Sequence, residues 1–268
     1  MEIKKVASAR LLAACRRFLE NDPPSNVLIL GDLYLPLFGV SDIYCALANG
    51  EIVGVCTIYH AFAIPSLTVN ATTTMAKEAL IQKALTEIRS DFISLCPPED
   101  VDLLKNHSTV LEFRPEHQMI TESPTRVKRD GIRAYRVRKK ELEALDRFYI
   151  EHHAEAWVPI QFETGPYFCV KDDNRIVSAA GVHLVAPQIA QLGNIVTDEA
   201  YINCGFGTVC TAALVSSLAR KGRIVSLFVR IGNAPAIHMY EKLGFVKVRD
   251  IAFLVMRKNP SSQSSTRF

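Results

Sequence analysis

Two closely spaced glycines, Gly205 and Gly207, are the first candidates for chemistry in this sequence. They lie in a loop between a strand predicted over 189–196 and a helix predicted from 206 to about 221. Glycine lets an anion approach the backbone closely, and the free N–H groups of a helix start point at that anion. The order of strand, glycine loop and helix therefore predicts a pyrophosphate site. A tight turn without a ligand is the alternative, and a dinucleotide fingerprint is disfavoured because its third glycine is replaced by Cys210.

A second motif follows a strand predicted over 224–230. Asn233 has the right residue type to cap a short helix, Pro235 is tolerated in the first turn, and Gly244 is suited to ending it. The helix also presents Tyr240 on one face with Ile237 and Leu243.

Together these two motifs resemble the GNAT superfamily of acyl-CoA N-acyltransferases, and the resemblance extends over residues 165–253. The superfamily signature Asn-x-x-Ala-x-x-x-Tyr-x-x-x-Gly-Phe is matched by Asn233, Ala236, Tyr240, Gly244 and Phe245. The loop 197–207 matches the family's pyrophosphate loop in length. Segments 163–167 and 26–34 are similar to a bacterial and archaeal group with a divergent, GNAT-like amino-terminal half.

The resemblance implies acetyl-CoA as co-substrate and no metal. The residues that it implies for CoA binding are Ile195, Val196, Thr197, Asn203, Cys204, Gly205, Phe206, Gly207, Thr208, Asn233, Ala236 and Tyr240. One position departs from the family, because Ile202 stands where Arg or Gln is usual. Loss of a guanidinium removes a bidentate phosphate contact, so we expect weaker CoA binding through the backbone amides that remain.

The mechanism implied by the family is direct attack of a neutral amine on the thioester in a ternary complex. An alkyl amine has a pKa of about 10.4, so freeing its lone pair at neutral pH costs on the order of 4 kcal/mol and favours a general base. Glu163 is the candidate base, with a surface carboxylate as the alternative. An amide near Ile195 or Val196 would bind the oxyanion, and Tyr240 would protonate the thiolate unless it only packs in the core. His183 could relay a proton, but it is interpreted as a hydrogen-bonded structural histidine.

The composition is that of a soluble globular protein: 49% of the 268 residues are hydrophobic and 22% are charged, with a net charge of +3. This small charge gives no reason to expect a nucleic-acid or membrane partner. Seven scattered cysteines without a CxxC pair indicate reduced thiols, so we expect a cytoplasmic protein. Local basic residues are interpreted as a solvated linker surface: Arg126, Lys128, Arg129, Arg133, Arg136, Arg138, Lys139 and Lys140.

The two halves of the chain repeat one pattern. In each, a helical segment precedes a predicted β-hairpin, whose turn is Asn49-Gly50 in the first half and Asp173-Asn174 in the second. A further strand, helix and strand follow each hairpin. We therefore predict an α/β protein of the α+β type, with two tandem GNAT-like domains, each a mixed, mostly antiparallel central sheet flanked by helices.

The predicted boundary lies in the polar stretch 114–133, giving domains at 1–125 and 126–258, and the Ser-rich segment 259–268 is predicted to be disordered. The first half has Ser66 to Thr72 where a glycine loop would be needed, so we predict that it binds no CoA and shapes the acceptor cleft or packs like a second subunit.

These observations predict an N-acetyltransferase that moves acetyl from acetyl-CoA to a primary amine, carried by a small molecule or a peptide, in a monomer or homodimer. Two alternatives remain open. One is a non-catalytic acyl-CoA sensor, and the other is transfer of a longer acyl group.

Overall fold

The computed structural model describes residues 1–127 and 129–259, and the strands of this part of the chain form one twelve-stranded sheet. The strand order is β1-β2-β3-β4-β5-β12-β6-β11-β10-β9-β8-β7. Residues 260–268, where a disordered tail is predicted, lie outside the described residues. The described helices include none long and apolar enough to cross a membrane.

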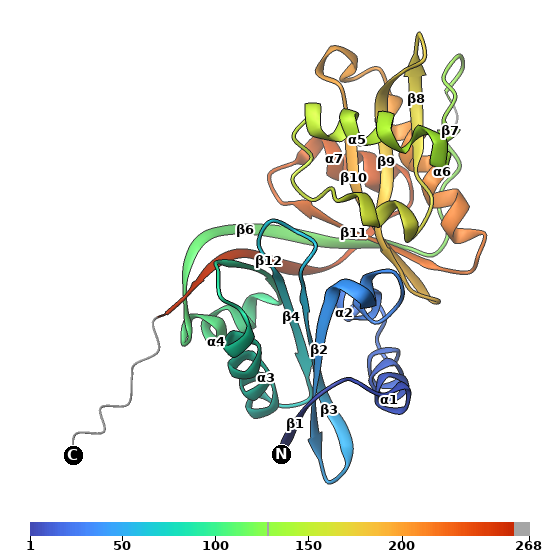
Figure 1. Ribbon diagram of the computed structural model, residues 1–268. Helices are drawn as coiled ribbons and strands as arrows, with labels where there is room; N and C mark the ends of the chain where they lie inside the picture. Colours follow the sequence, from blue (N-terminus) through green and yellow to red (C-terminus); the bar gives the residue numbers. More distant parts are fainter. Residues whose placement is uncertain (128, 260–268) are drawn as a thin grey trace, which may run out of the picture.

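The first half contributes one end of this sheet. Its elements are β1 (Glu2–Lys5), α1 (Ala9–Leu19), α2 (Val27–Asp32), β2 (Ser41–Ala48), β3 (Glu51–Tyr59), β4 (Ser66–Ala71), α3 (Thr74–Glu87), β5 (Phe92–Cys96), α4 (Val101–Lys105) and β6 (Ser108–Thr121). Helix α3 packs on one face of β1 to β4, whereas α1 and α2 pack on the other. Figure 1 shows α1 and α2 on the side that faces the second half.

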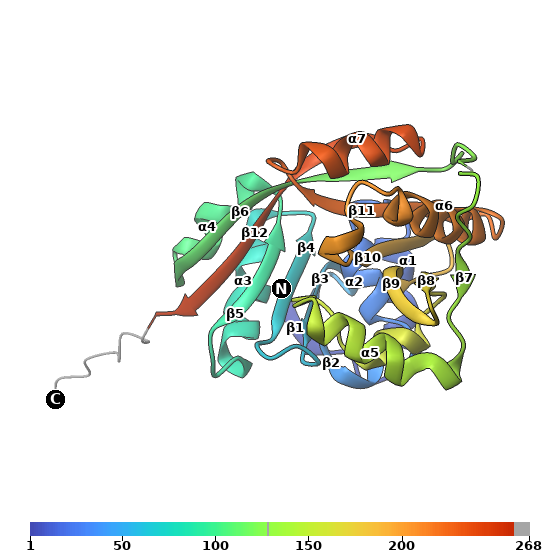
Figure 2. The same cartoon turned by 90° about the horizontal axis from the view of Figure 1, so that it is seen from above.

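The second half repeats this order. Its elements are β7 (Tyr135–Arg136), α5 (Leu142–Glu151), η4 (Pro159–Glu163), β8 (Phe168–Asp172), β9 (Arg175–Val185), β10 (Ile189–Thr197), α6 (Phe206–Ala219), β11 (Ile224–Arg230), α7 (Ala234–Lys242) and β12 (Val246–Lys258). Figure 2 shows α6 and α7 on one side of β8 to β11 and α5 on the other. The fold prediction is confirmed, because each half has a mixed, mostly antiparallel set of strands with helices on both faces.

The hairpin turns have the backbone geometry that their residues predict. Asn49 and Gly50 have φ angles of 52° and 84°, and Asp173 and Asn174 have φ angles of 43° and 64°. Two successive positive φ values match the right-handed twist of the flanking strands, and Asn, Asp and Gly tolerate them best. Both hairpins are thus determined locally.

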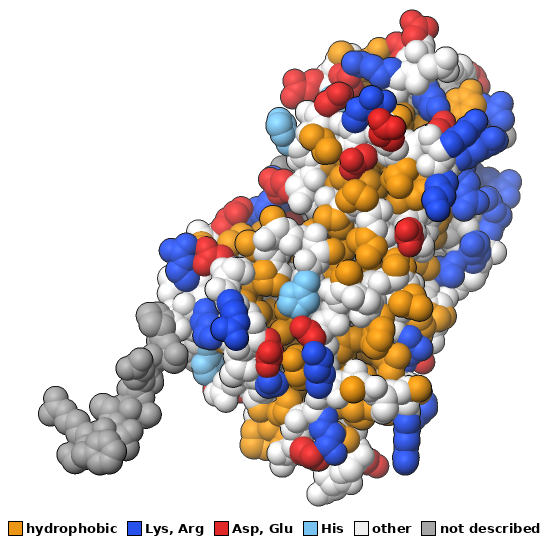
Figure 3. Space-filling view, viewed as in Figure 1, with side chains coloured by type: hydrophobic (Ala, Val, Ile, Leu, Met, Phe, Trp, Pro, Cys, Tyr) orange, Lys and Arg blue, Asp and Glu red, His pale blue; other side chains and the backbone are white. Residues whose placement is uncertain are grey.

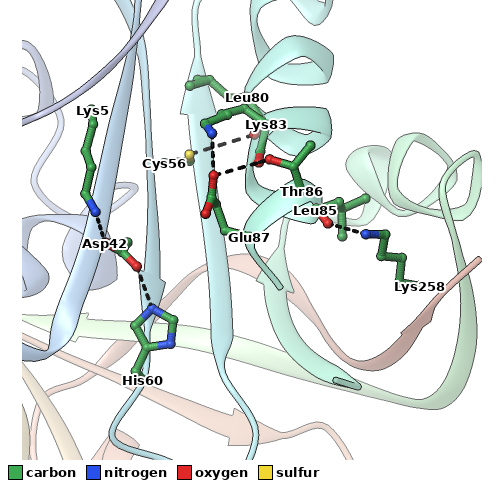
Figure 4. A network of polar contacts seen from close by, with 10 residues as sticks. All are labelled: Lys5, Asp42, Cys56, His60, Leu80, Lys83, Leu85, Thr86, Glu87 and Lys258. Carbon is green, nitrogen blue, oxygen red and sulfur yellow. Dashed lines mark hydrogen bonds and ion pairs between the residues drawn. The ribbon is translucent and has the colours of Figure 1, made fainter. Parts of the chain in front are cut away.

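The two halves exchange their last strands. Strand β6 leaves the first half and pairs with β11, whereas β12 leaves the second half and pairs with β5. The two strands also pair with each other over most of their lengths, and they run side by side from one half into the other (Figure 1). Near the end of β12, Lys258 Nζ donates a 2.6 Å hydrogen bond to the Leu85 carbonyl of α3 (Figure 4).

This exchange determines the structure of the polar stretch in which the boundary is predicted. Residues 114–121 of that stretch form the second part of β6, because pairing to β11 on one side and β12 on the other satisfies their backbone. Pro115 lies in this part of β6, and its carbonyl accepts a hydrogen bond from the Ile231 N–H. The irregular connection begins after Thr121.

The halves also contact each other through α1 and α2, and this contact is apolar. Helices α1 and α2 share a buried cluster with Leu184, Ala186 and Ile189 of the second half. Gly31 packs so closely on Leu184 that a Cβ at position 31 would overlap the leucine side chain. Helix α2 is thereby held against β9 and β10.

Candidate active site

Strands β10 and β11 separate part-way along their length, and the candidate site surrounds this separation. Their parallel pairing covers three residue pairs and ends where Gln191 faces Ser226. Beyond these residues β10 continues to Thr197 and β11 to Arg230 without pairing to each other. Diverging strands leave backbone N–H and C=O groups that an extended ligand can use, as in strand addition.

A β-bulge in β10 lies next to the separation. Asn194 and Ile195 together oppose a single residue of β9, Ala180. Asn194 has a φ of 53°, and its carbonyl accepts a 2.7 Å hydrogen bond from the Tyr149 hydroxyl. Its Nδ2 donates to Gln161 Oε1 over 2.8 Å. These bonds fix the backbone beside Ile195, where the family resemblance predicts an oxyanion-binding amide.

The glycine loop forms an open helix start. Gly205, the N-cap of α6, has a φ of 84°, and no side chain caps the helix. In the described chain, no hydrogen bond uses the backbone N–H groups of residues 205–208. A helix start with free amides and a positive dipole end suits an anion. The predicted residues Asn203 and Cys204 are exposed beside it, and Thr197 Oγ1 lies close to Gly207.

One arginine reaches this loop from the connection between the halves. A Cβ at Gly205 would lie 2.7 Å from Cδ, Nε and Cζ of Arg129, so the arginine side chain rests on the glycine. Ile202, where the family usually has Arg or Gln, is 55% exposed. Arg129 thus brings a guanidinium to Gly205, whereas Arg175 Nη2 is paired with Asp198 Oδ2 at the start of the loop. Figure 3 shows Lys and Arg side chains gathered along this edge of the second half.

Helix α7 begins and packs as its motif predicts. The Asn233 side chain accepts a 3.2 Å hydrogen bond from the Ala236 N–H and caps the helix. Tyr240 is 7% exposed and packs edge-on against Phe245, with 5.8 Å between ring centroids. Its hydroxyl makes no hydrogen bond to the described residues, yet it is not among the fully buried unpaired atoms, so it retains solvent contact. Burial raises the pKa of Tyr240 well above its usual range.

A cavity of about 540 Å³ lies on the α2 side of the sheet, next to the separation of β10 and β11. Both halves and both exchanged strands contribute to its lining. Its polar and charged lining residues are Asp32, Tyr59, Ser66, Thr68, Glu112, Arg114, Glu116, Glu155, Gln161, His183, Gln191, Asn194 and Arg230. On the face shown in Figure 3, hydrophobic side chains gather over the junction of the halves.

Four buried atoms of cavity-lining residues have no hydrogen-bond partner in the described chain: Tyr59 Oη, Arg114 Nε, His183 Nε2 and Gln191 Oε1. Arg114 Nε still forms a 3.1 Å ion pair with Glu112, whereas the other three have no partner of either kind. Buried polar groups are normally paired, so unpaired ones that line a cavity indicate a polar ligand. Burial lowers the pKa of His183 to about 4, which makes the ring neutral near pH 7. The interpretation of His183 as a hydrogen-bonded structural histidine stays a prediction, and the unpaired Nε2 leaves the alternative of a proton relay open.

Ion pairs border the cavity. Arg114 of β6 and Arg230 of β11 both approach Glu155 Oε2, at 3.1 and 3.4 Å. Glu116, the strand neighbour of Arg230, is partly buried, and this burial raises its pKa against the opposing effect of the two arginines. Glu163, the predicted base, is exposed at the end of η4 and is not among the residues that line the cavity.

The sequence and the fold were compared with protein-family models, curated proteins and solved structures. A family model described as FR47-like protein matches residues 173–254, and no curated protein matched the sequence. A tandem GNAT protein from the clavulanic acid biosynthesis pathway superposes with a TM-score of 0.63 and 13% identity, covering 97% of this chain and 99% of that one. The chain therefore has the fold of the GNAT acetyltransferases.

Two further GNAT structures cover nearly the same length. A GCN5-related N-acetyltransferase-like protein from Streptococcus suis has a TM-score of 0.64 and 14% identity, covering 92% of this chain and 100% of that one. An acetyltransferase of the GNAT family from Colwellia psychrerythraea has a TM-score of 0.58 and 14% identity, covering 95% and 100%. The likeness therefore includes the first half as well as the half that carries the motifs.

In this GNAT fold, the glycine loop and α7 follow β10 and β11, the two strands that separate. Sequence reasoning missed Asp32 and Arg129. Nothing in the spacing of Asp32 distinguishes it from a surface aspartate, and Arg129 is one of several basic residues in its segment.

Proposed function

We propose that this GNAT protein is an acetyl-CoA-dependent N-acetyltransferase that acts on a primary amine. The observation that carries the proposal is the separation of β10 and β11 between two different environments. On one side lies a helix start with free amides, suited to the CoA pyrophosphate. On the other lies a cavity with unpaired polar atoms, suited to an acceptor.

The reaction is direct transfer. The neutral amine nitrogen attacks the thioester carbonyl, the new C–N bond forms, and the C–S bond breaks as the tetrahedral intermediate collapses. The amine loses one proton and the CoA thiolate gains one. The bulged backbone near Ile195 is the proposed oxyanion site, and the Tyr240 hydroxyl is the proposed proton donor to the thiolate.

Tyr240 suits this role through position rather than acidity. Its raised pKa keeps the hydroxyl protonated, and the hydroxyl has no partner in the described chain that would compete for its proton. Glu163 remains the candidate base from the sequence. Because its carboxylate is exposed and outside the cavity lining, proton removal by Glu163 would have to pass through water.

The binding of CoA phosphates is proposed to combine the amides of residues 205–208 with the guanidinium of Arg129. Arg129 would supply the charge that Ile202 does not. Charge-assisted hydrogen bonds to phosphate are roughly twice as strong as neutral ones, so the weaker CoA binding expected from Ile202 alone would be offset.

The test is a calorimetric titration with acetyl-CoA, followed by measurement of free thiol release against a panel of amines. Acetyl-CoA binding with amine-dependent thiol release, reduced in Tyr240→Phe, supports the transferase. Binding without release for any amine would indicate the acyl-CoA sensor instead. Tighter binding and faster release with a longer acyl-CoA would identify a different acyl donor, and no binding of any acyl-CoA would overturn the proposal.

A further inference from the structure

The first half supplies a buried carboxylate to the cavity. Asp32 is the last residue of α2 and is 6% exposed. Its Oδ2 accepts a 2.6 Å hydrogen bond from Thr57 Oγ1, which lies 2.8 Å from the Thr68 hydroxyl. Its Oδ1 has no hydrogen bond or ion pair among residues 1–127 and 129–259, and it is not one of the fully buried unpaired atoms, so it retains contact with the solvent of the cavity.

The position of Asp32 follows from the docking of α2 on the second half. The preceding residue, Gly31, packs directly on Leu184 of β9. Leu184 is the strand partner of Gln191, the last residue of β10 that pairs with β11. Asp32 therefore lies near the point where the two strands separate, although it belongs to the half without a glycine loop.

A largely buried carboxylate without a paired charge is unfavourable unless a cation or several hydrogen-bond donors compensate it. Here a single hydroxyl donates to it, and the side chain lines the same cavity as the unpaired atoms of Tyr59, His183 and Gln191. Much of the rest of the cavity is apolar, including Phe62 and Phe228. A ligand that complements this lining has a cationic group and an apolar body.

We infer that this cavity is the acceptor pocket and that it takes a small primary amine with an alkyl or arylalkyl body, whose ammonium group is bound by Asp32. Calling the cavity an acceptor pocket rests on the proposed function, but its selectivity for amines can be measured without any acetyl transfer. A cavity of about 540 Å³ has the size of a small-molecule site, which favours a free amine over a folded protein surface. The carboxylate is also an acceptor inside the cavity for the proton that the amine loses before attack.

The experiment compares matched ligands that differ only in the amine. Phenethylamine and phenethyl alcohol, and hexylamine and hexanol, are titrated into the full-length protein by calorimetry at about pH 8, where these amines are cations. We expect the wild-type protein to bind each amine roughly tenfold or more tightly than its alcohol, because a hydrogen bond to a charged group is being measured. In Asp32→Asn this preference should disappear, whereas acetyl-CoA binding should stay unchanged.

The matched control is Asp100→Asn, which removes a carboxylate paired with Lys77 away from the cavity and should keep the amine preference. Equal affinity for amine and alcohol in the wild-type protein would overturn the inference. So would a failure to detect amine binding at millimolar concentrations, or a preference for the amine that is retained in Asp32→Asn. Retained acetyl-CoA binding and an unreduced melting temperature show that the variant is folded.

Failure of the proposed function gives a different pattern. If amines bind selectively through Asp32 but no acyl-CoA binds, the cavity assignment stands and the transferase does not. If acetyl-CoA binds and amines are acetylated, but Asp32→Asn acetylates them with unchanged KM, the transferase stands and the assignment of Asp32 falls.

Discussion

Helices α3 and α6 follow equivalent strands in the two halves but begin in different ways. At α3, the Thr73 hydroxyl accepts a 3.2 Å hydrogen bond from the Ala76 N–H, so a side chain of the protein occupies the helix start. At α6, Gly205 has no side chain to place there. The same backbone arrangement is thus closed by a cap in one half and left open to an anion in the other.

The places where neighbouring strands separate also differ between the halves, because polar groups there have partners in the first half and lack them in the second. Strands β4 and β5 pair only at two positions before they diverge, much as β10 and β11 do. In the first half, however, buried Asn26 at the start of α2 accepts a hydrogen bond from Asn70 of β4 and donates one to the Leu19 carbonyl. The first half thus has internal partners at the places where the second half has unpaired groups.

The largest effect on activity is expected from a substitution of Tyr240, in the half with the open helix start. Tyr240→Phe removes the proposed proton donor, and we expect kcat to fall by roughly 10²–10⁴-fold, the usual contribution of general acid catalysis, with acetyl-CoA affinity within about twofold of wild type. Steady-state thiol release and calorimetry measure the two quantities. The matched control is Tyr135→Phe on exposed β7, which should leave both unchanged. A fall in acetyl-CoA affinity without a fall in kcat would assign Tyr240 to packing.

The next largest effect is expected from obstructing the open start of α6 and removing the cap of α3. In Gly205→Val, a β-branched residue is forced to a φ of 84° and its Cβ meets Arg129, so we expect acetyl-CoA affinity to fall roughly 10–100-fold. In Thr73→Ala, acetyl-CoA affinity should not change, but the free energy of unfolding should drop by about 1 kcal/mol. Calorimetry and urea unfolding of both variants test the pair. If Thr73→Ala weakened acetyl-CoA binding, the capped helix start of the first half would contribute to the binding of acetyl-CoA, contrary to this comparison.

The buried carboxylate of the first half should make stability depend on pH. Burial raises the pKa of Asp32 from 3.8 to about 7, against the smaller effect of the Thr57 hydrogen bond. The folded state therefore holds this proton more tightly, and the stability it confers is lost as pH rises through about 7. We expect Asp32→Asn to be more stable than wild type at pH 8, by on the order of 2 kcal/mol, with the difference shrinking towards pH 5.

Urea unfolding of both proteins at the two pH values measures this difference, and subtracting one protein from the other removes the other titrating groups. Tyr59 is the titratable neighbour of Asp32, and its pKa is raised as well, so it stays neutral throughout this range. A difference that is the same at both pH values would show that Asp32 keeps an ordinary pKa.

The smallest effect is expected at the connection between the halves. Arg129→Ala should weaken acetyl-CoA binding by about tenfold, the size of one hydrogen bond to a charged group, and Arg129→Lys should restore part of the loss. Arg133→Ala, a neighbouring arginine that instead stacks on Tyr135, is the control. The loss in Arg129→Ala should also decrease at high salt, because screening weakens the contact. Equal effects of the two alanine variants would mean a general charge effect.

The features that the sequence determined are local. The hairpin turns, the Asn233 cap, the glycine loop before a helix and the order of strands and helices in each half follow from residue types a few positions apart. The GNAT fold was predicted for the same reason, because the two motifs that carry the resemblance are local. The domain boundary at 125 remains a prediction, and it falls in the irregular connection between β6 and β7.

Only the tertiary structure decided which distant segments meet. Strands β6 and β12 exchange between the halves because each finds two partners for its backbone there, and their pairing joins residues more than a hundred positions apart, such as His117 and Asp250. Asp32 and Arg129 acquire their proposed roles in the same way, through the docking of α2 on β9 and of the connection on the glycine loop. Local patterns specify which face of an element is apolar, but not which surface covers it.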